Sequence, residues 1–391
     1  MLKGKLNFMC CKIMFSLPVF FTFLSMVSHG QVLLKPSPEE LYKEKCHLDL
    51  LDYINLHNSV YHSPQVKYVV FKPVGGLADR FTGMVTGFLY ALLKNRVFYL
   101  DWPGFEHAFR PLSITVSPPS HLILGKKADA MLSKKDVSIY FQHRLDAEKV
   151  IYLSGNRGNV YQILTHPNFK KRCKAFGLQQ NTAFACIFNF LVQPTDAIRD
   201  AYMWLRQEVL ATSSISIGIQ IRTFQLKKNT ISSKNVSEDS GISVSTSFIK
   251  CAQEIEDSRS GKKNTTWLII SDSSSLRASI RDQFKFKKIL SPNISQSSLS
   301  SNWWGQQPGD TPDTELSLSP FQQSVGELWL FSHCDYYVYT SKSGYGRVGG
   351  VSGLKADRLY PIGPRKDSRN VRSCTKGGSR ISQVSLTSAG L

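Results

Sequence analysis

The sequence predicts an α/β fold made of two doubly wound domains with parallel sheets. Residues 66–72 predict a strand, the residues from Phe81 an amphipathic helix, and residues 96–101 a second strand, so that together they make a βαβ unit. Strand and helix patterns alternate again beyond residue 195. The chain has 391 residues, which is enough for two domains of ordinary size.

The helix of the first βαβ unit is predicted by its apolar spacing. One helical face carries the apolar side chains Phe81, Met84, Val85, Phe88, Leu89 and Leu92. Gly83 and Gly87 lie one turn apart on this helix, where another backbone could approach closely. Residues 102–190 are less periodic, and loops are expected over 113–119 and 155–158.

The second domain is predicted from a longer series of elements. A helix is expected over 195–210, with Thr195 as its N-cap. Further helices are expected over 245–257, 274–284 and 325–333, and strands over 215–222, 267–271, 287–290 and 335–340. Residues 291–320 are rich in Ser, Pro, Gly and Gln, which is typical of a long loop. Trp303 and Trp304 in this loop could stack on a sugar or plug a hydrophobic gap.

Composition excludes several classes of protein. Hydrophobic residues make up 42% and charged residues 20% of the chain, which is ordinary globular usage and rules out a disordered or fibrous chain. The net charge is +19, so an anionic partner is expected, such as a nucleotide-linked donor, a polyanionic glycan or a membrane surface. No nucleic-acid-binding motif occurs in the sequence, so we expect no nucleic-acid partner.

The N-terminus indicates entry into the secretory pathway. Lys3, Lys5 and Lys12 precede an apolar run over residues 13–27, which is the pattern of a secretory signal. Counted from Leu6, the run approaches the ~20 residues that a membrane-spanning helix needs. Two outcomes stay open: a signal peptide cleaved near Gly30, or an uncleaved signal-anchor. In both, the rest of the chain lies in the lumen or outside the cell.

Sequons and cysteines fit an oxidising compartment. Asn235, Asn264 and Asn293 each begin a glycosylation sequon. Cys10 and Cys11 lie beside the apolar run, and the six remaining cysteines allow 15 pairings among which the sequence does not choose. Their spacing does not fit a zinc site, and we expect no metal.

A glycine-containing loop follows the first strand. Gly75 and Gly76 permit unusual backbone angles, and Asp79 and Arg80 follow at the start of the helix. Open α/β sheets bind ligands at the carboxyl ends of their strands, where this loop lies. A purely structural alternative is a tight turn in which Asp79 caps the helix.

Two more segments carry chemistry suited to a phosphate. Gln220 and Arg222 end a buried strand, and arginine is a planar donor that matches a pyrophosphate. The alternative for Arg222 is a salt bridge at the strand end. Ser341, Ser343 and Gly346 follow the strand over 335–340, and hydroxyls and backbone N–H groups at a helix start form an anion site. A glycine-rich turn is the alternative there.

Together these segments resemble the plant xyloglucan fucosyltransferase family, whose members transfer L-fucose from GDP-fucose to a galactose hydroxyl. The matching segments are GLADR at 76–80, FLYALL at 88–93, QPT at 193–195, IGIQIRTF at 217–224, LIIS at 268–271 and the glycine-rich stretch 340–361. The sequence departs from the family at Asp79, where the family has Asn, and at 342–346, where KSGYG replaces WSTFG.

The resemblance implies a GT-B-like fold, in which two Rossmann-type domains face a donor cleft. Residues 66–194 would form the N-terminal, acceptor-side domain and residues 195–364 the GDP-sugar-binding domain. Residues 1–30 would be the signal-anchor or signal peptide, residues 31–65 a stem and residues 365–391 a basic, poorly ordered tail. The enzyme would be an inverting one, held in the Golgi membrane as a single-pass type II protein with its catalytic domain in the lumen.

The resemblance also implies the residues of the site. Arg222 would pair with the pyrophosphate of GDP. The predicted donor-binding set is Gly75, Gly76, Arg80, Gln220, Arg222, Asp272, Ser341, Ser343, Tyr345 and Gly346. Arg222 and Asp79 are the predicted catalytic residues, although Asp101 and Asp272 also lie at strand ends and the choice of general base stays open.

The sequence contains no Asp-x-Asp pair of the kind that holds a metal-bound diphosphate. We therefore expect a metal-independent reaction without a cofactor, in which positive side chains and helix N-termini stabilise the leaving GDP. A secreted glycan-binding protein of the same fold is the alternative, favoured by the altered 341–346 segment and opposed by Arg222. A sulfotransferase is a third, weaker reading, because Lys72 precedes the glycines instead of following them.

Overall fold

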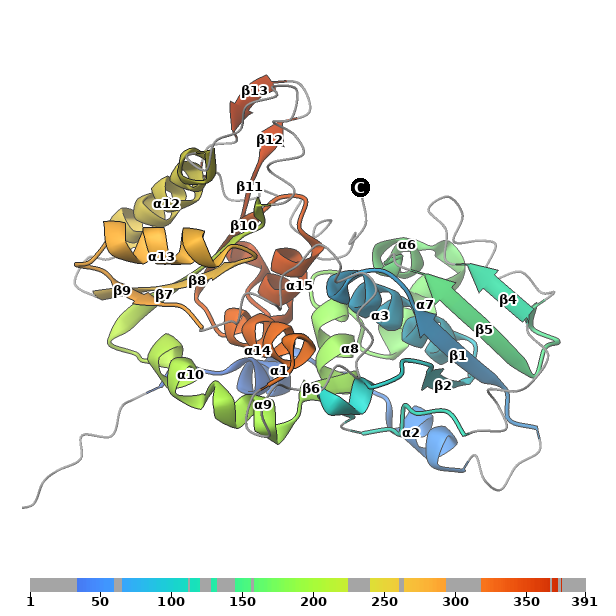
Figure 1. Ribbon diagram of the computed structural model, residues 1–391. Helices are drawn as coiled ribbons and strands as arrows, with labels where there is room; N and C mark the ends of the chain where they lie inside the picture. The colour runs from blue at the N-terminus through green and yellow to red at the C-terminus, as the bar shows by residue number, and fades with distance from the viewer. Residues whose placement is uncertain are drawn as a thin grey trace, which may run out of the picture. The chain divides into compact units, whose positions relative to one another are not determined.

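The computed structural model describes residues 34–59, 65–111, 113–119, 128–131, 145–155, 158–223, 240–259, 264–292, 318–365, 368–371 and 374. These residues form a mixed α/β protein with two parallel sheets (Figure 1). The predicted signal-anchor over 1–30 lies outside them. None of the helices in the described part of the chain is long and apolar enough to cross a membrane.

The first sheet has four parallel strands in the order β2-β1-β5-β4. The strands are β1 (Tyr68–Pro73), β2 (Val97–Leu100), β4 (Ala128–Met131) and β5 (Val150–Gly155). Helix α3 (Leu77–Leu93) joins β1 to β2, so the predicted βαβ unit is confirmed. A Cβ on Gly83 would lie 2.9 Å from the carbonyl oxygen of Gly155, so this glycine does permit the close backbone approach that we expected.

The second sheet has five parallel strands in the order β11-β10-β7-β8-β9. The strands are β7 (Ser214–Ile221), β8 (Asn264–Ser271), β9 (Lys288–Leu290), β10 (Tyr336–Thr340) and β11 (Leu359–Ile362). The four predicted strands of this region are therefore confirmed. They are nearly continuous apolar runs because a parallel sheet is covered on both faces.

Alternate residues of β7 face two different layers of helices. Ile217, Ile219 and Ile221 pack against α12 (Ser240–Arg259) and α13 (Ser274–Gln283), which lie on one side of the sheet (Figure 1). The opposite face contacts α14 (Pro320–Ser332) and α15 (Gly344–Ser352). On that face a Cβ at Gly218 would lie 2.6 Å from the ring of Phe331, so glycine is needed for this packing.

The helix expected over 195–210 is two helices. α9 (Asp196–Ala201) and α10 (Met203–Leu210) meet at Tyr202, whose ring packs on Gly326 and whose hydroxyl donates to the Gln323 carbonyl oxygen at 3.2 Å. Thr195 is the N-cap residue of α9, as expected, but its side chain makes no capping hydrogen bond.

The region 102–190 contains more regular structure than its sequence pattern indicated. It adds the short helix η2 (Phe105–His107), α6 (Val160–Thr165), α7 (Pro167–Ala175), α8 (Ala183–Leu191), and the antiparallel pair β3 (Phe109–Pro111) and β6 (Val192–Pro194). α8 is only nine residues long and almost entirely buried, and a short apolar run of this kind does not distinguish a helix from a buried strand.

Residues 34–59, which we expected to be a stem, belong to the folded body. They form α1 (Pro38–Lys45) and α2 (Leu51–Asn58), and Leu41, Leu50 and Tyr53 are buried. A disulfide joins Cys46 to Cys186 on α8. The prolines that indicated a stem have a different role, because Pro38 occupies the first turn of α1, a position at which proline is favoured.

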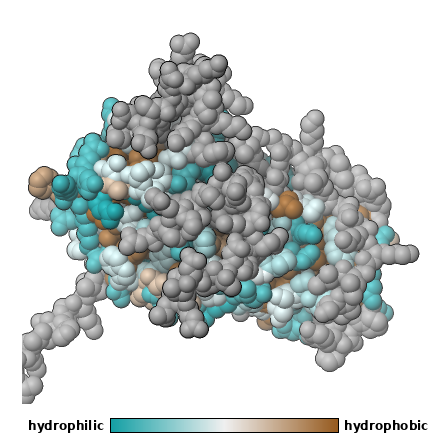
Figure 2. Space-filling view, viewed as in Figure 1, coloured by the Kyte–Doolittle hydropathy of each residue, from teal (hydrophilic) through white to brown (hydrophobic). Residues whose placement is uncertain are grey.

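One hydrophobic core extends through both halves of the chain. α15 contacts both α3 and α8, and buried residues from all three helices belong to the same cluster. Residues 33–391 accordingly form one compact unit. On the face shown in Figure 2, the described surface is mostly hydrophilic or intermediate, with hydrophobic residues in small separate areas.

Part of the segment expected to be a poorly ordered tail has regular structure. β12 (Pro364–Arg365) pairs with β13 (Ser368–Val371) in an antiparallel hairpin. Cys374 forms a disulfide with Cys251 on α12, while Cys173 and Cys334 are free and buried. The remainder of 365–391 lies outside the described residues.

Candidate active site

Three of the predicted segments meet at one edge of the five-stranded sheet. In the parallel pairing, Gln220 of β7 lies opposite Tyr339 of β10, and Ile221 lies opposite Ser271 of β8. The residues that follow these strands, Arg222, Asp272 and Ser341, are therefore brought to the same carboxyl edge, where open α/β sheets bind ligands.

The backbone N–H of Arg222 is hydrogen-bonded, whereas the Nε of its side chain has no hydrogen-bond partner among the described residues. Its N–H donates to Thr340 Oγ1 at 2.9 Å. Its guanidinium Nε is buried, yet no atom of the described residues accepts a hydrogen bond from it. The salt bridge that was the structural alternative for Arg222 does not occur among the described residues. A buried donor without an acceptor is costly unless a ligand supplies one.

Gln220 lies beside Arg222 on the same strand and is only 4% exposed. Its Oε1 is also buried without a hydrogen-bond partner. A Cβ on Gly346 would collide with this oxygen, so the glycine at the start of α15 makes room for the Gln220 side chain. This contact brings two of the predicted donor residues together.

The start of α15 is held in place by hydrogen bonds within the helix and to α14 and β11. Ser343 is fully buried, and its hydroxyl caps the helix by accepting from Gly346 N–H at 3.4 Å. Tyr345 donates its hydroxyl to the Ser324 carbonyl oxygen of α14 at 2.6 Å, and burial raises the pKa of this tyrosine. Ser341 donates its backbone N–H to Ile362 at 2.7 Å. These residues therefore shape the loop whose N–H groups border the edge.

Asp272 fastens the segment that follows Arg222. One of its carboxylate oxygens accepts from Thr223 N–H at 2.7 Å and from the Thr223 hydroxyl at 2.9 Å. Thr223 and Thr340 were not among the predicted site residues. Thr340 is the last residue of β10 and Thr223 lies two positions after β7, so a hydroxyl residue near a strand end was the signal in the sequence.

In the glycine loop of the first sheet, Gly75 has a φ of 88°, which favours glycine. Asp79 accepts from Gly76 N–H at 3.3 Å, so it does cap α3, as the structural alternative held. Arg80 Nε donates to the Gly75 carbonyl oxygen at 2.9 Å, and its guanidinium lies 5.2 Å from the centre of the Trp102 ring. Burial lowers the pKa of Arg80.

The glycine loop and the start of α15 lie against each other. A Cβ on Gly344 would be 3.2 Å from Ala78 Cβ and 3.9 Å from Asp79 Oδ1. The N-termini of α3 and α15 are thus neighbours, and each is the positive end of a helix dipole. Arg80 lies in the first turn of α3, and the backbone of Arg222 is bonded to Thr340 before α15, so this region favours an anionic ligand.

A buried ion pair that the sequence analysis missed, Arg277 with Glu327, is hydrogen-bonded to the end of β8 at the same edge. Arg277 Nη1 lies 2.6 Å from Glu327 Oε1, and both side chains are almost completely buried. Arg277 also donates to the carbonyl oxygens of Ser271 and Pro292. Burial raises the pKa of Glu327, and Arg277 opposes this rise. The signal was a lone carboxylate in the apolar run VGELWLF at 325–331.

Several predictions concern other parts of the chain. Asn264 is exposed at the first position of β8, so a glycan attached there would leave the carboxyl edge free. Asn235, Asn293, Trp303 and Trp304 lie outside the described residues. In the described part of the chain, no group of three His, Cys, Asp or Glu side chains could hold a metal ion.

Comparison with known proteins settles the family. The model of the xyloglucan fucosyltransferase family matches residues 39–108 and 142–379. The chain belongs to the xyloglucan fucosyltransferase family. It is therefore an enzyme, a fucosyltransferase, and the resemblance noted in its sequence is confirmed. A sequence search of curated proteins gave no significant match.

Solved structures show the fold of this fucosyltransferase. A mutant of Arabidopsis thaliana FUT1 in complex with GDP superposes with a TM-score of 0.55 and 17% sequence identity, over 85% of this chain and 79% of that one. The fucosyltransferase NodZ from Bradyrhizobium gives a TM-score of 0.48 and 13% identity, over 80% of this chain and 100% of that one. The superposition on FUT1 shows that this chain shares the mixed α/β fold of that protein.

Proposed function

We propose that this fucosyltransferase moves L-fucose from GDP-fucose to a galactose hydroxyl of a glycan, with inversion at the anomeric carbon and without a metal ion. The observation that carries the proposal is the buried Nε of Arg222, which has no protein partner at the carboxyl edge of the second sheet. A pyrophosphate oxygen is the acceptor that suits it. The FUT1 structure with GDP shows that a protein of this fold accommodates the nucleotide.

The donor would lie between the carboxyl edges of the two sheets, in the cleft expected of a GT-B fold. Arg222 would bind the pyrophosphate, and the N–H groups at the start of α15 would face its oxygens. Gln220, beside Gly346, would supply an acceptor oxygen to the nucleotide. Arg80, beneath the neighbouring loop, would add positive charge.

In the reaction, a galactose oxygen attacks the anomeric carbon of fucose from the face opposite to GDP. The new C–O bond forms as the bond from the anomeric carbon to the phosphate oxygen breaks, and the configuration inverts. The negative charge that GDP gains would be stabilised by Arg222 and by the helix N-termini, which replace a metal ion in this role. The proton of the attacking hydroxyl must pass to a base.

Among the carboxylates considered, Asp101 is the best candidate for that base. Asp79 already accepts from Gly76 N–H, and Asp272 accepts from Thr223, so both have structural duties. Asp101 follows β2 and precedes Trp102, which lies under the Arg80 guanidinium. We expect Asp101→Asn to lower kcat by roughly 10²- to 10⁴-fold with little change in GDP affinity. Asp79→Asn, which keeps an acceptor oxygen for Gly76, is the matched control.

The proposed reaction is tested by incubating the full chain with GDP-fucose and lactose or a galactose-bearing xyloglucan oligosaccharide. GDP-mannose and UDP-galactose serve as donor controls, and each reaction is run with EDTA and with added manganese. We expect fucosylated product from GDP-fucose in EDTA, with the anomeric configuration opposite to that of the donor by NMR. Glycan binding without turnover would instead support the glycan-binding alternative. Activity that requires manganese would refute metal independence.

The proposed location is the Golgi membrane, with residues 1–30 as the anchor of a type II protein and a lumenal catalytic domain. Lys3, Lys5 and the apolar run support it, and the two disulfides fit an oxidising lumen. Secretion after cleavage near Gly30 is the alternative. N-terminal sequencing of the mature protein distinguishes them, because cleavage would give a chain that starts at Gln31.

A further inference from the structure

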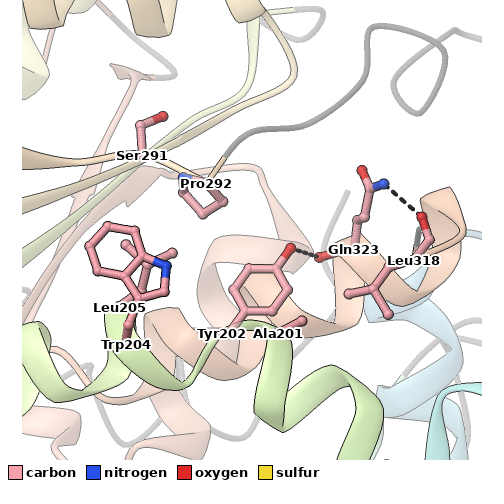
Figure 3. A pocket seen from close by; sticks show the side chains of 8 residues that line it. All are labelled: Ala201, Tyr202, Trp204, Leu205, Ser291, Pro292, Leu318 and Gln323. Atoms are coloured by element: carbon pink, nitrogen blue, oxygen red, sulfur yellow. Dashed lines mark hydrogen bonds between the residues drawn. The ribbon is translucent and has the colours of Figure 1, made fainter. Parts of the chain in front are cut away.

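A cavity of about 290 Å³ lies apart from the predicted donor residues. It is enclosed by the junction of α9 with α10, the residues after β9 and the start of α14 (Figure 3). Its lining residues are Ala201, Tyr202, Trp204, Leu205, Ser291, Pro292, Leu318 and Gln323. None of the donor-binding or catalytic residues named above is among them, so the cavity calls for a different ligand.

The walls of the cavity combine an aromatic surface with a few polar atoms. Trp204 is 61% exposed, which is high for such a large apolar side chain, and lies at one end beside Ser291 (Figure 3). Gln323 lies at the other end and donates from Nε2 to the Leu318 carbonyl oxygen at 2.7 Å. The Oε1 of Gln323 is buried and has no hydrogen-bond partner.

This chemistry selects for a neutral, hydroxyl-bearing ring. None of the described residues that line the cavity carries a charge, so these residues offer no ionic partner to a phosphate or a carboxylate. The C–H face of a sugar ring packs on an indole, while an amide oxygen and a serine hydroxyl bind sugar hydroxyls. The volume is at the lower end of ligand pockets, which start at about 300 Å³, and so suits a single ring rather than a nucleotide.

The cavity is connected to the donor edge through α14. The carbonyl oxygen of Gln323 accepts from Tyr202, and the carbonyl oxygen of the next residue, Ser324, accepts from Tyr345 at the start of α15. Two successive residues of α14 therefore contact the cavity wall and the helix that borders the donor.

We propose that this cavity is a carbohydrate subsite that binds one pyranose ring of the glycan acceptor, a ring other than the galactose that receives fucose. The identity of the glycan rests on the proposed function. The subsite would add affinity for long acceptors and none for short ones, because a disaccharide held at the donor edge would not extend into it.

The test uses the full chain without donor. Calorimetry measures binding of a galactose-bearing xyloglucan oligosaccharide and of lactose to wild type, Trp204→Ala and Trp204→Phe. We expect Trp204→Ala to weaken the long oligosaccharide about tenfold, the loss typical of truncating one important contact, and to leave lactose unchanged. Trp204→Phe keeps an aromatic face and should retain most of the affinity. In transfer assays, KM for the long acceptor should rise while kcat and the KM for GDP-fucose stay constant.

Phe286→Ala is the matched control, because Phe286 is a fully exposed aromatic residue outside the cavity. Thermal unfolding of every variant excludes a folding defect as the cause. Unchanged long-oligosaccharide affinity in folded Trp204→Ala, or an equal loss in Phe286→Ala, would overturn the subsite. Trp204-dependent oligosaccharide binding in a chain that fails to transfer fucose would support the subsite and refute only the proposed function.

Discussion

The two ends of the five-stranded sheet differ in whether their buried polar groups have hydrogen-bond or ion-pair partners. At the amino end, Asp335 lies 2.5 Å from Lys35 and 3.4 Å from Lys355, and it also accepts from the N–H and the hydroxyl of Ser216. At the carboxyl end, Arg222 Nε and Gln220 Oε1 are buried without any protein partner. Buried polar groups that have partners stabilise the fold, whereas buried polar groups without one are available to bind a ligand.

The amino end also fixes the N-terminal segment. Lys35 reaches Asp335 from the residues before α1, its backbone N–H donates to Leu210, and Leu34 forms a β-bridge with Ala211. The chain that leads from the proposed anchor is therefore attached to the edge of the sheet opposite the proposed donor. We expect substitutions at the amino end to change stability and those at the carboxyl end to change ligand binding.

The largest effect should come from Asp335→Ala. It would leave Lys35 and Lys355 without their buried counter-charge, and breaking such a pair costs about 3–5 kcal/mol. We expect a loss of this size in the free energy of unfolding by chemical denaturation, with unchanged GDP affinity in the folded fraction. Asp357→Ala, at an exposed neighbouring carboxylate, is the control. A large fall in GDP affinity in folded Asp335→Ala would contradict the division between the two ends.

The converse experiment is Arg222→Ala. We expect GDP to bind more weakly by roughly 2–5 kcal/mol, as when one partner of a buried charge pair is removed. Calorimetry measures this affinity, and the free energy of unfolding without GDP should hardly change because Arg222 Nε has no partner to lose. Arg281→Ala on the exposed side of α13 is the control. Undiminished GDP affinity in folded Arg222→Ala would sink the donor-site assignment.

The smallest effect is a pH dependence of stability that originates at the amino end. Burial opposes ionisation of Asp335, but Lys35 and Lys355 outweigh it, so its pKa lies below the ordinary value. Its contribution is complete above the unfolded pKa of about 3.9 and is lost as pH falls through the lower folded pKa. In this range the unfolded chain binds the extra proton, and stability therefore rises with pH.

Denaturation curves measured from neutral pH downwards check this dependence. Asp335→Asn should lower the slope of unfolding free energy against pH by about one proton below pH ~4. Glu39, whose pKa is also lowered because His333 outweighs the effect of burial, should keep part of the acid sensitivity. An Asp335→Asn variant with the wild-type slope would show that Asp335 is not a source of the acid sensitivity.

How well each element of the fold could be predicted depended on how clearly its sequence shows which side chains are buried. Strands β1, β2, β7, β8, β9 and β10 and the α3 helix were predicted because apolar runs and a clear helical face are local features. α8 was missed because its nine residues are nearly all apolar, and an apolar run of that length fits a buried strand as well as a helix. The helices α1 and α2 were not predicted within the expected stem, because both are short and their prolines and polar residues resemble a linker.

The candidate site also has features that the sequence shows and contacts that only the structure shows. Arg222 and the glycine loops were recognised because strand-end position and residue type are visible in the chain. The sequence offered Asp79 as a cap of α3, but it did not show that Ser343 caps α15 or that Arg277 and Glu327 meet across 50 residues. These contacts depend on elements distant in sequence or on hydrogen-bond geometry that several local conformations could satisfy.

The sequence by itself determined the α/β class and the family resemblance and indicated the segments that we propose bind the donor, because each is encoded in local periodicity and in residue type at strand ends. Only the tertiary structure decided which polar groups are satisfied. It neutralised Asp335 with Lys35 from 300 residues away and left Arg222 Nε without a partner. Whether a buried charge stabilises the fold or awaits a ligand depends on which atoms surround it, and parallel sheet packing brings those atoms together from distant parts of the chain.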